Sequence, residues 1–199
     1  DASSTAKVQK VSGTRRMYVG FHQGEKYANT EGGRAIQKSE VLRAIQYSVD
    51  VEAICANLLN APCKRATGIV NPNNAHPNLE PYPYKPEVAE YLLDQAGYPR
   101  DANGVRFEIT LEAGHGRYLN DKNVVLAICQ YLDDVGIKTK CDIMDWSSVY
   151  VPKIIKKEAG PMFFLGSGGG TWNPLYDMTD LATVESGPNY TKWDNPEWF

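Results

Sequence analysis

Three short segments carry arginine, aromatic and glycine residues at places where strands are expected to end. They are GHGRY at residues 114–118, DW at 145–146 and GSGGGTWNP at 166–174. An arginine offers a fixed fork of hydrogen-bond donors, and tyrosine and tryptophan offer flat apolar surfaces. This combination suits a small anionic or hydroxyl-rich molecule that is held by hydrogen bonds and stacking.

The residues that we expect to contact such a molecule all lie in these segments. They are Arg117, Tyr118, Trp146, Gly170, Thr171 and Trp172. Arg117 is expected to donate hydrogen bonds, the tryptophans to stack, and Thr171 and the glycine amides to add polar contacts. The alternative is that the tryptophans fill the core between helices and that Arg117 pairs with a carboxylate. The convergence of the segments favours a ligand site.

Two other functions compete with this interpretation, namely nucleotide binding and hydrolysis. The glycine run lacks the Gly-Lys-Ser/Thr element and the G-x-G-x-x-G spacing of phosphate-binding loops. A hydrolase with Ser167 as nucleophile and His115 as its base is the alternative function. The strained turn of many such enzymes needs glycine two residues before the serine, and Leu165 stands there. We therefore expect a binding protein that is not an enzyme and needs no cofactor.

The composition limits the partners. A chain of 199 residues with 42% hydrophobic residues can bury the core of one domain. Its net charge of −3 gives no basic excess for binding nucleic acid. No apolar run approaches the about 20 residues of a membrane span, and residues 1–5 lack the features of a signal peptide. We expect that any export signal has been removed.

The cysteines and histidines do not predict a metal site. Cys55, Cys63, Cys129 and Cys141 lack the paired spacing of zinc ligands, and the three histidines lie far apart in the sequence. Buried or disulfide-bonded thiols are expected instead. In an exported protein, Cys55 and Cys63 are candidates for a short-range bridge, since a helix end can fold back through Pro62. The sequence leaves the pairing open.

The hydrophobic pattern predicts which elements carry the three segments. Residues 107–111 and 137–143 alternate in polarity, and 162–165 are wholly apolar, so each is expected to be a strand. Helices are expected from Asn120 to Gly136 and from Ser147 to Gly160. Right-handed crossovers place the three strands parallel in one α/β sheet. The ligand crevice of such a sheet lies outside the carboxyl ends of its strands.

The first half of the chain is expected to begin with a strand at residues 16–22 and a loop at 23–34. Ser39 and Asp50 each precede apolar residues at helical spacing, so each is expected to cap a helix.

A long excursion and a further helix follow. Residues 61–86 are rich in proline and asparagine and are expected to be irregular. The helix after them has Pro86 at its first position and Gly97 at its end.

Several segments resemble the family-5 extracellular solute-binding proteins, which bind peptides, nickel and related ligands for ABC importers. Residues 40–54, EVLRAIQYSVDVEAI, resemble the family pattern VRxALxYAIDREAI. Residues 84–89, 96–99, 116–122 and 135–137 are similar to further family segments. Their order and spacing agree from about Val11 to the end of the chain.

The resemblance implies a periplasmic-binding-protein-like (type II) lobe with a mainly parallel sheet flanked by helices. Residues 1–199 would form the C-terminal ligand-binding lobe of a larger two-lobed protein, whose N-terminal lobe and C-terminal end are absent here. Such a protein is expected to act as a monomer in the periplasm or outside the cell, with a lipid anchor on the full-length protein. It would deliver a solute to an ABC permease in the membrane. A sensor domain that binds a partner protein is a third alternative.

The resemblance also implies roles for single residues. Arg117 matches an arginine that binds the ligand carboxylate in dipeptide-binding members, and Trp146 matches a tryptophan of the peptide pocket. Gly170 stands where peptide binders carry an aspartate for the ligand's amino group. A buried ammonium without a counter-charge costs several kcal/mol. We therefore expect an anionic or neutral polar ligand, such as an oligosaccharide or an opine-like compound, ahead of an ordinary peptide.

Overall fold

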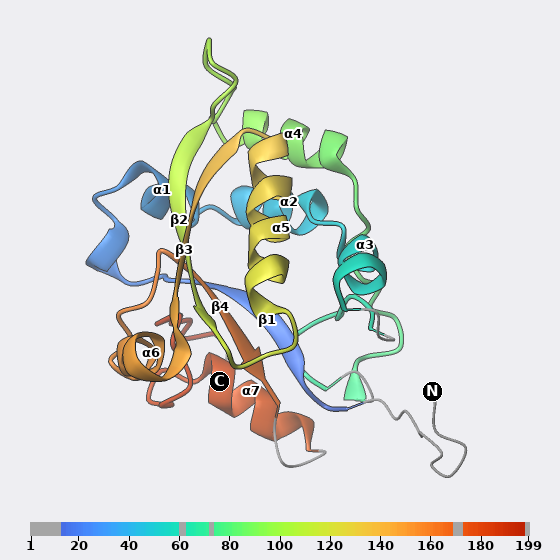
Figure 1. Ribbon diagram of the computed structural model, residues 1–199, viewed down its shortest axis with the longest axis vertical. Helices are drawn as coiled ribbons and strands as arrows, with labels where there is room; N and C mark the ends of the chain where they lie inside the picture. Colours follow the sequence, from blue (N-terminus) through green and yellow to red (C-terminus); the bar gives the residue numbers. More distant parts are fainter. Residues whose placement is uncertain (1–12, 60–62, 72–73, 169–172, 198–199) are drawn as a thin grey trace.

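The computed structural model describes residues 13–59, 63–71, 74–168 and 173–197, which build one four-stranded sheet with helices around it (Figure 1). The strands are β1 (Arg16–Phe21), β2 (Phe107–His115), β3 (Ile137–Asp145) and β4 (Met162–Ser167), in the spatial order β1-β4-β2-β3. Strand β2 pairs in parallel with both β3 and β4, and β1 pairs antiparallel with β4. The predicted α/β sheet with three parallel strands is confirmed.

Seven α-helices lie within the described residues. They are α1 (Glu31–Ala35), α2 (Ser39–Ser48), α3 (Val51–Ile54), α4 (Pro86–Gln95), α5 (Asp121–Asp134), α6 (Val151–Ile155) and α7 (Pro174–Ala182). A π-helical turn, Cys55–Leu59, extends α3, and another, Trp146–Tyr150, precedes α6. No helix of the described residues is long and apolar enough to cross a membrane.

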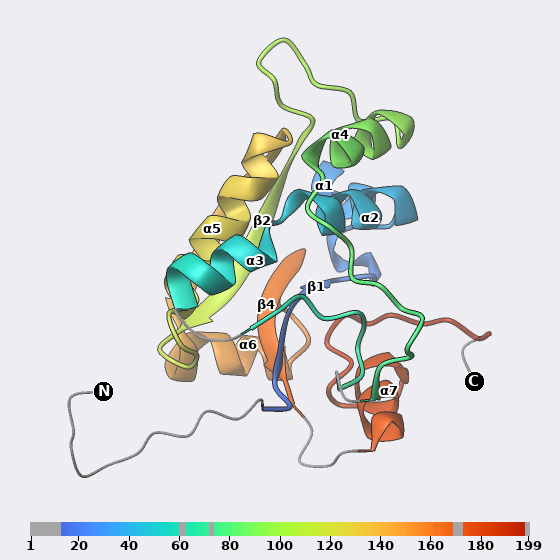
Figure 2. The ribbon, with the colours of Figure 1, turned by 90° about the vertical axis from the view of Figure 1, so that its right-hand side faces the viewer.

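The larger core lies on one face of the sheet. Phe107, Ile109 and Leu111 of β2 are buried there, because alternate residues of a strand point to the same face. Helices α2, α4 and α5 supply the opposing apolar side chains, and Figure 2 shows these helices on this side of the sheet.

A smaller core lies on the other face. It contains Tyr150 and Ile154, from the segment between β3 and β4, with Phe163 and Leu165 of β4. The Tyr150 hydroxyl donates a hydrogen bond of 2.8 Å to the carbonyl of Phe164. Both faces of the sheet are thus packed.

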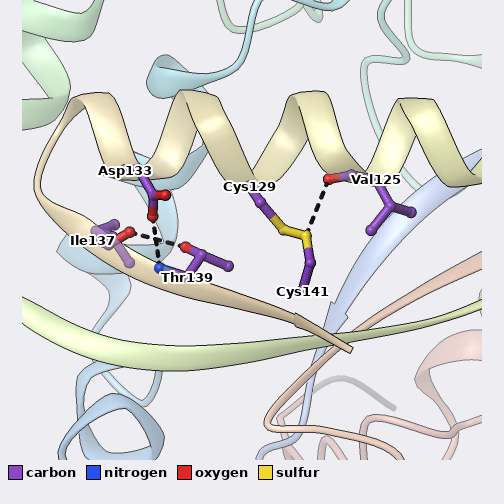
Figure 3. Close-up of a disulfide and its surroundings, with 6 residues drawn as sticks. All are labelled: Val125, Cys129, Asp133, Ile137, Thr139 and Cys141. Carbon is purple, nitrogen blue, oxygen red and sulfur yellow. Dashed lines mark hydrogen bonds between the residues drawn. A yellow bond between two sulfur atoms is a disulfide. The ribbon is translucent and has the colours of Figure 1, made fainter. Parts of the chain in front are cut away.

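Two disulfides fasten helices to their neighbours. The candidate bridge between Cys55 and Cys63 is present, with 5.6 Å between the Cα atoms. A second bridge, Cys129–Cys141, which was not predicted, joins α5 to β3 (Figure 3). Close by, the Thr139 amide donates a hydrogen bond of 2.6 Å to Asp133 of α5, as Figure 3 also shows. Helix α5 is therefore attached to β3 by a covalent bond and a polar contact.

The predicted loop at residues 23–34 is wrong at its end, where α1 begins. Thr30 caps this helix by accepting a hydrogen bond of 3.0 Å from the Gly33 amide. A Cβ atom at Gly33 would lie 1.9 Å from the Tyr27 carbonyl oxygen. A Cβ at Gly32 would lie 2.5 Å from the Glu108 carbonyl oxygen of β2. These glycines, which suggest a loop in the sequence, allow a helix to pack closely.

Of the predicted caps of α2, α3 and α5, one is confirmed and two differ from the structure. Asp50 accepts a hydrogen bond of 2.8 Å from the Ala53 amide, as expected. Ser39 is already the first residue of α2, and Lys38 holds the cap position. Asn120 occupies the cap position of α5 but has a φ of 53°, and its side-chain amide donates to the Leu58 carbonyl. Long-range contact has replaced local capping there.

The helix between β3 and β4 begins and ends earlier than predicted. Asp145, not Ser147, caps it by accepting a hydrogen bond of 2.8 Å from the Ser148 amide. Helix α6 ends at Ile155, before Gly160. The excursion was predicted at residues 61–86, and its described part before Pro86 contains no strand and no α-helix. Pro86 begins α4, as predicted.

Candidate functional site

The carboxyl ends of the three parallel strands lie at one edge of the sheet. His115 of β2 pairs with Asp145 of β3, and β4 ends at Ser167. The turns that leave β2 and β3 bring Arg117, Tyr118 and Trp146 together. The rings of Tyr118 and Trp146 meet edge to face with 5.3 Å between centroids, and the Arg117 guanidinium carbon lies 5.8 Å from each ring. Gly170, Thr171 and Trp172 lie outside the described residues.

Contacts with β4 fix the Tyr118 ring. Its hydroxyl accepts a hydrogen bond of 3.1 Å from the Gly166 amide, and its ring centroid lies 6.5 Å from that of Phe164. A Cβ atom at Gly166 would come within 2.9 Å of the Tyr118 ring. Glycine at this position therefore lets the ring lie against the strand.

Asp121, which the sequence did not single out, holds the turn that carries Arg117. Its carboxylate accepts hydrogen bonds from the amides of Arg117 (3.0 Å), Tyr118 (2.9 Å) and Lys122 (2.8 Å). Burial alone raises the pKa of Asp121, but these donors outweigh it and the pKa is lowered. A charged Asp121 thus fixes the backbone from which Arg117 projects. The sequence signal for this role was an acidic residue in the first turn of α5, where a negative charge is favoured.

The alternative to a ligand site, in which the tryptophans fill the core and Arg117 pairs with a carboxylate, holds only in part. Trp146 is half-buried and lies 5.7 Å, between ring centroids, from the core residue Tyr150, so it contributes to packing. Arg117 is exposed, and within the described part of the chain no ion pair includes it. Its charge therefore faces solvent beside two aromatic rings.

Two arginines also reach this edge, Arg16 at the start of β1 and Arg15 just before it, and neither was predicted as a site residue. Arg16 is buried and forms two hydrogen bonds, of 2.8 and 2.6 Å, with the carboxylate of Asp177 in α7. The Arg16 guanidinium lowers the pKa of Asp177. Arg15 is exposed, and its guanidinium carbon lies 5.6 Å from the Tyr118 ring centroid. The sequence shows only that two adjacent arginines of a strand face opposite sides, and it does not place either of them at this edge.

The geometry gives no support to the hydrolase alternative. The hydrogen-bond partner of the Ser167 hydroxyl is the Arg16 guanidinium, at 3.4 Å. No hydrogen bond among the described residues joins Ser167 to His115, whereas an activated serine needs a base in contact with it. Nor do the described residues contain a group of three or more acidic, cysteine or histidine residues able to hold a metal ion.

The sequence profile of the bacterial extracellular solute-binding proteins, family 5 (middle region), matches residues 1–188. The chain belongs to this family, which is one of solute-binding proteins and not of enzymes. The glutathione-binding protein GsiB of Escherichia coli (strain K12) is 31% identical over 153 residues, which are 75% of this chain and 29% of GsiB. The chain thus spans less than a third of the length of this curated relative.

Solved structures agree on the fold. The oligopeptide-binding protein AppA from Bacillus subtilis, in complex with a nonapeptide, matches with a TM-score of 0.72 and 19% identity. That match covers 93% of this chain and 37% of AppA. NikA from Brucella suis, in complex with Fe(III)-EDTA, matches with a TM-score of 0.71 and 23% identity over 92% of this chain and 36% of NikA. The predicted periplasmic-binding-protein-like fold is confirmed.

Proposed function

We propose that this chain is the C-terminal ligand-binding lobe of a two-lobed protein that captures a small solute for an ABC importer. The observation that carries the proposal is the exposed Arg117 guanidinium beside the rings of Tyr118 and Trp146, at the carboxyl edge of the parallel strands. This edge is where open α/β sheets bind ligands. Membership of the solute-binding family supports the same role.

The solute that this edge suits is small and polar or anionic. A guanidinium binds carboxylates through paired hydrogen bonds, and the two rings offer stacking surfaces. The curated relative is named for glutathione, and the structural neighbours hold a nonapeptide and Fe(III)-EDTA. The candidate solutes are therefore acidic peptides, oligosaccharides and opine-like compounds. We propose Gly170, Thr171 and Trp172 as further residues that contact the solute.

The proposed mechanism is closure of a second lobe over the bound solute, followed by docking on a membrane permease. Hinge closure of this kind needs no covalent chemistry, and the ligand stabilises the closed arrangement by contacting both lobes. The family is named for extracellular proteins, which supports a place for the full-length protein in the periplasm or outside the cell. We propose in addition that the full-length protein is a monomer with a lipid anchor.

The proposal is tested on the full-length protein with a panel of acidic peptides, glutathione, oligosaccharides and opine-like compounds. Thermal shift should find a stabilising solute, and calorimetry should give its affinity. Replacing Arg117 by glutamine should weaken binding at least 10-fold, since a hydrogen bond to a charged group contributes about 1.5–3 kcal/mol.

The matched control is Arg43→Gln, which removes another exposed arginine, on α2 and away from this edge. This variant should bind the solute as the unmodified protein does. Unchanged affinity in Arg117→Gln would show that Arg117 does not contact the ligand. A full-length protein that no member of the panel stabilises would contradict the proposed function itself.

A further inference from the structure

Two arginines from distant parts of the sequence approach the same tyrosine. Arg15 precedes β1, and Arg117 lies in the turn after β2. Both guanidinium carbons lie within 5.8 Å of the Tyr118 ring centroid. Family resemblance assigns a role to Arg117 but none to Arg15. The reason why Arg15 lies beside Tyr118 must therefore be found in its contacts.

The pairing of β1 with β4 explains why Arg15 is on the Tyr118 side. Arg16 is buried against Asp177, so its two neighbours point to the opposite face of the sheet. One of them, Met17, pairs with Gly166, and a Cβ atom at Gly166 would touch both the Met17 sulfur and the Tyr118 ring. Arg15 shares this face with Met17. The buried Arg16 therefore directs Arg15 toward the site.

The segment after β4 also passes close to Arg15. A Cβ atom at Gly168 would lie 3.1 Å from the Arg15 Cα. Any larger residue at 168 would have to displace the backbone from which Arg15 projects. The main chain at Arg15 thus lies close to Gly168 and is followed directly by the anchored Arg16.

Within the part of the chain that the structure describes, the charges of Arg15 and Arg117 have no acidic partners. No ion pair within the described residues includes either arginine, and both side chains are exposed. Two like charges near one ring repel each other, and contact with the ring offsets only part of that repulsion. An anionic group bound between or beside them would remove it. The arrangement therefore favours a ligand with more negative charge than Arg117 alone can match.

We propose that Arg15 is a second anion-binding residue of the site and that the solute carries two carboxylates, one for each arginine. The proposal rests on the proposed function and narrows its substrate class. Arg15 would act as a specificity residue, since a solute with a single carboxylate leaves one guanidinium without a counter-charge.

Glutathione and its two monoethyl esters test this pairing, because each ester removes the charge of one carboxylate. Affinities for the full-length protein and its Arg15→Gln and Arg117→Gln variants are measured by calorimetry. We expect glutathione to bind the unmodified protein at least 10-fold more tightly than either ester. Arg15→Gln should weaken glutathione binding about 10-fold and leave binding of one ester unchanged. Arg117→Gln should show the same pattern with the other ester.

Controls separate this inference from the proposed function. Arg43→Gln should change none of the affinities, and all variants should keep the unfolding midpoint of the unmodified protein without ligand. The inference is wrong if Arg15→Gln weakens glutathione and both esters equally, as would happen if Arg15 paired with a carboxylate of the second lobe. It is also wrong if the protein binds only those solutes of the panel that have no carboxylate or a single one, in which case the proposed function stands. Failure to bind any solute refutes the proposed function.

Discussion

A buried ion pair holds together the edge that carries the candidate site. The side chains of Arg16 and Asp177 are 5% and 4% exposed, and they join β1 to α7. The Asp177 carboxylate also accepts a hydrogen bond of 3.0 Å from the Asn71 amide in the irregular excursion. Buried charges are tolerated when they are paired and hydrogen-bonded, as both are here. Three segments that are distant in sequence therefore depend on one carboxylate.

Replacing Asp177 by asparagine should lower the free energy of unfolding by about 3–5 kcal/mol, because it leaves the Arg16 charge buried without a counter-charge. Urea unfolding followed by circular dichroism measures the change. The matched control is Glu108→Gln in the exposed pair of Glu108 with Lys138, whose side chains are 69% and 61% exposed. An exposed pair contributes less than about 1 kcal/mol. Equal effects of the two substitutions would contradict the assigned role of burial.

At the level of elements, two helices end in a glycine with a left-handed backbone, and the surroundings of these glycines differ. Gly97 follows α4 with a φ of 86°, and Gly136 follows α5 with a φ of 87°. A Cβ atom at Gly97 would meet nothing closer than 3.9 Å, whereas one at Gly136 would lie 2.9 Å from the Gly104 carbonyl oxygen. Position 97 therefore requires glycine only for its left-handed backbone conformation. Position 136 requires glycine both for this conformation and because a side chain there would collide with the neighbouring backbone.

Alanine at these two positions separates the two requirements. Gly97→Ala should lower the free energy of unfolding by about 1 kcal/mol, the cost of a left-handed conformation in a residue with a side chain. Gly136→Ala should cost clearly more, since backbone must also move where α5 turns into β3. Thermal unfolding of both variants checks the order. If Gly97→Ala is as destabilising as Gly136→Ala, steric contact does not distinguish the two helix ends.

At the scale of the whole molecule, His22 directly follows β1 and lies against the connection from α6 to β4. Its side chain is fully buried, its ring is 5.1 Å from that of Tyr27 between centroids, and its amide donates to the Pro161 carbonyl. Burial lowers the pKa of His22 below its ordinary value of 6.5, and the charges of Lys192 and Lys26 act in the same direction. The folded protein therefore keeps this ring neutral.

This buried histidine should make the protein less stable in mild acid. The unfolded chain gains a proton at His22 as the pH falls through about 6.5, and the folded chain gains it only at a lower pH. The stabilisation is thus complete above pH 6.5 and is lost toward the lower folded pKa, at up to about 1.4 kcal/mol per pH unit. Urea unfolding between pH 7.5 and 5.5 measures it. His22→Gln should remove this part of the pH dependence.

The control for that experiment is His115→Gln, because His115 is exposed at the end of β2. This variant should retain the pH dependence of the unmodified protein. A His22→Gln variant that loses stability in acid as steeply as the unmodified protein would show that another group causes the effect.

Local patterns in the sequence were sufficient for the main elements and for part of the site. Alternating and helical periodicity predicted β2, β3, α4 and α5, since each pattern reports which face of an element is buried, and a wholly apolar run predicted β4. Parallel strands then place the turns after them at one edge. For that reason Arg117, Tyr118 and Trp146 could be predicted as neighbours before any contact was known.

Tertiary structure decided the features that depend on contacts between distant segments. The antiparallel pairing of β1 with β4, the Cys129–Cys141 bridge and the ion pair of Arg16 with Asp177 have no local signature. Which charge is buried with which depends on where whole elements pack, and nothing in the neighbouring residues encodes that. The same reason applies to Arg15, whose place beside Tyr118 follows from the register of β1 and not from its sequence context. The sequence by itself therefore determined the main elements and one arginine of the site, and only the folded chain brought the second arginine to it.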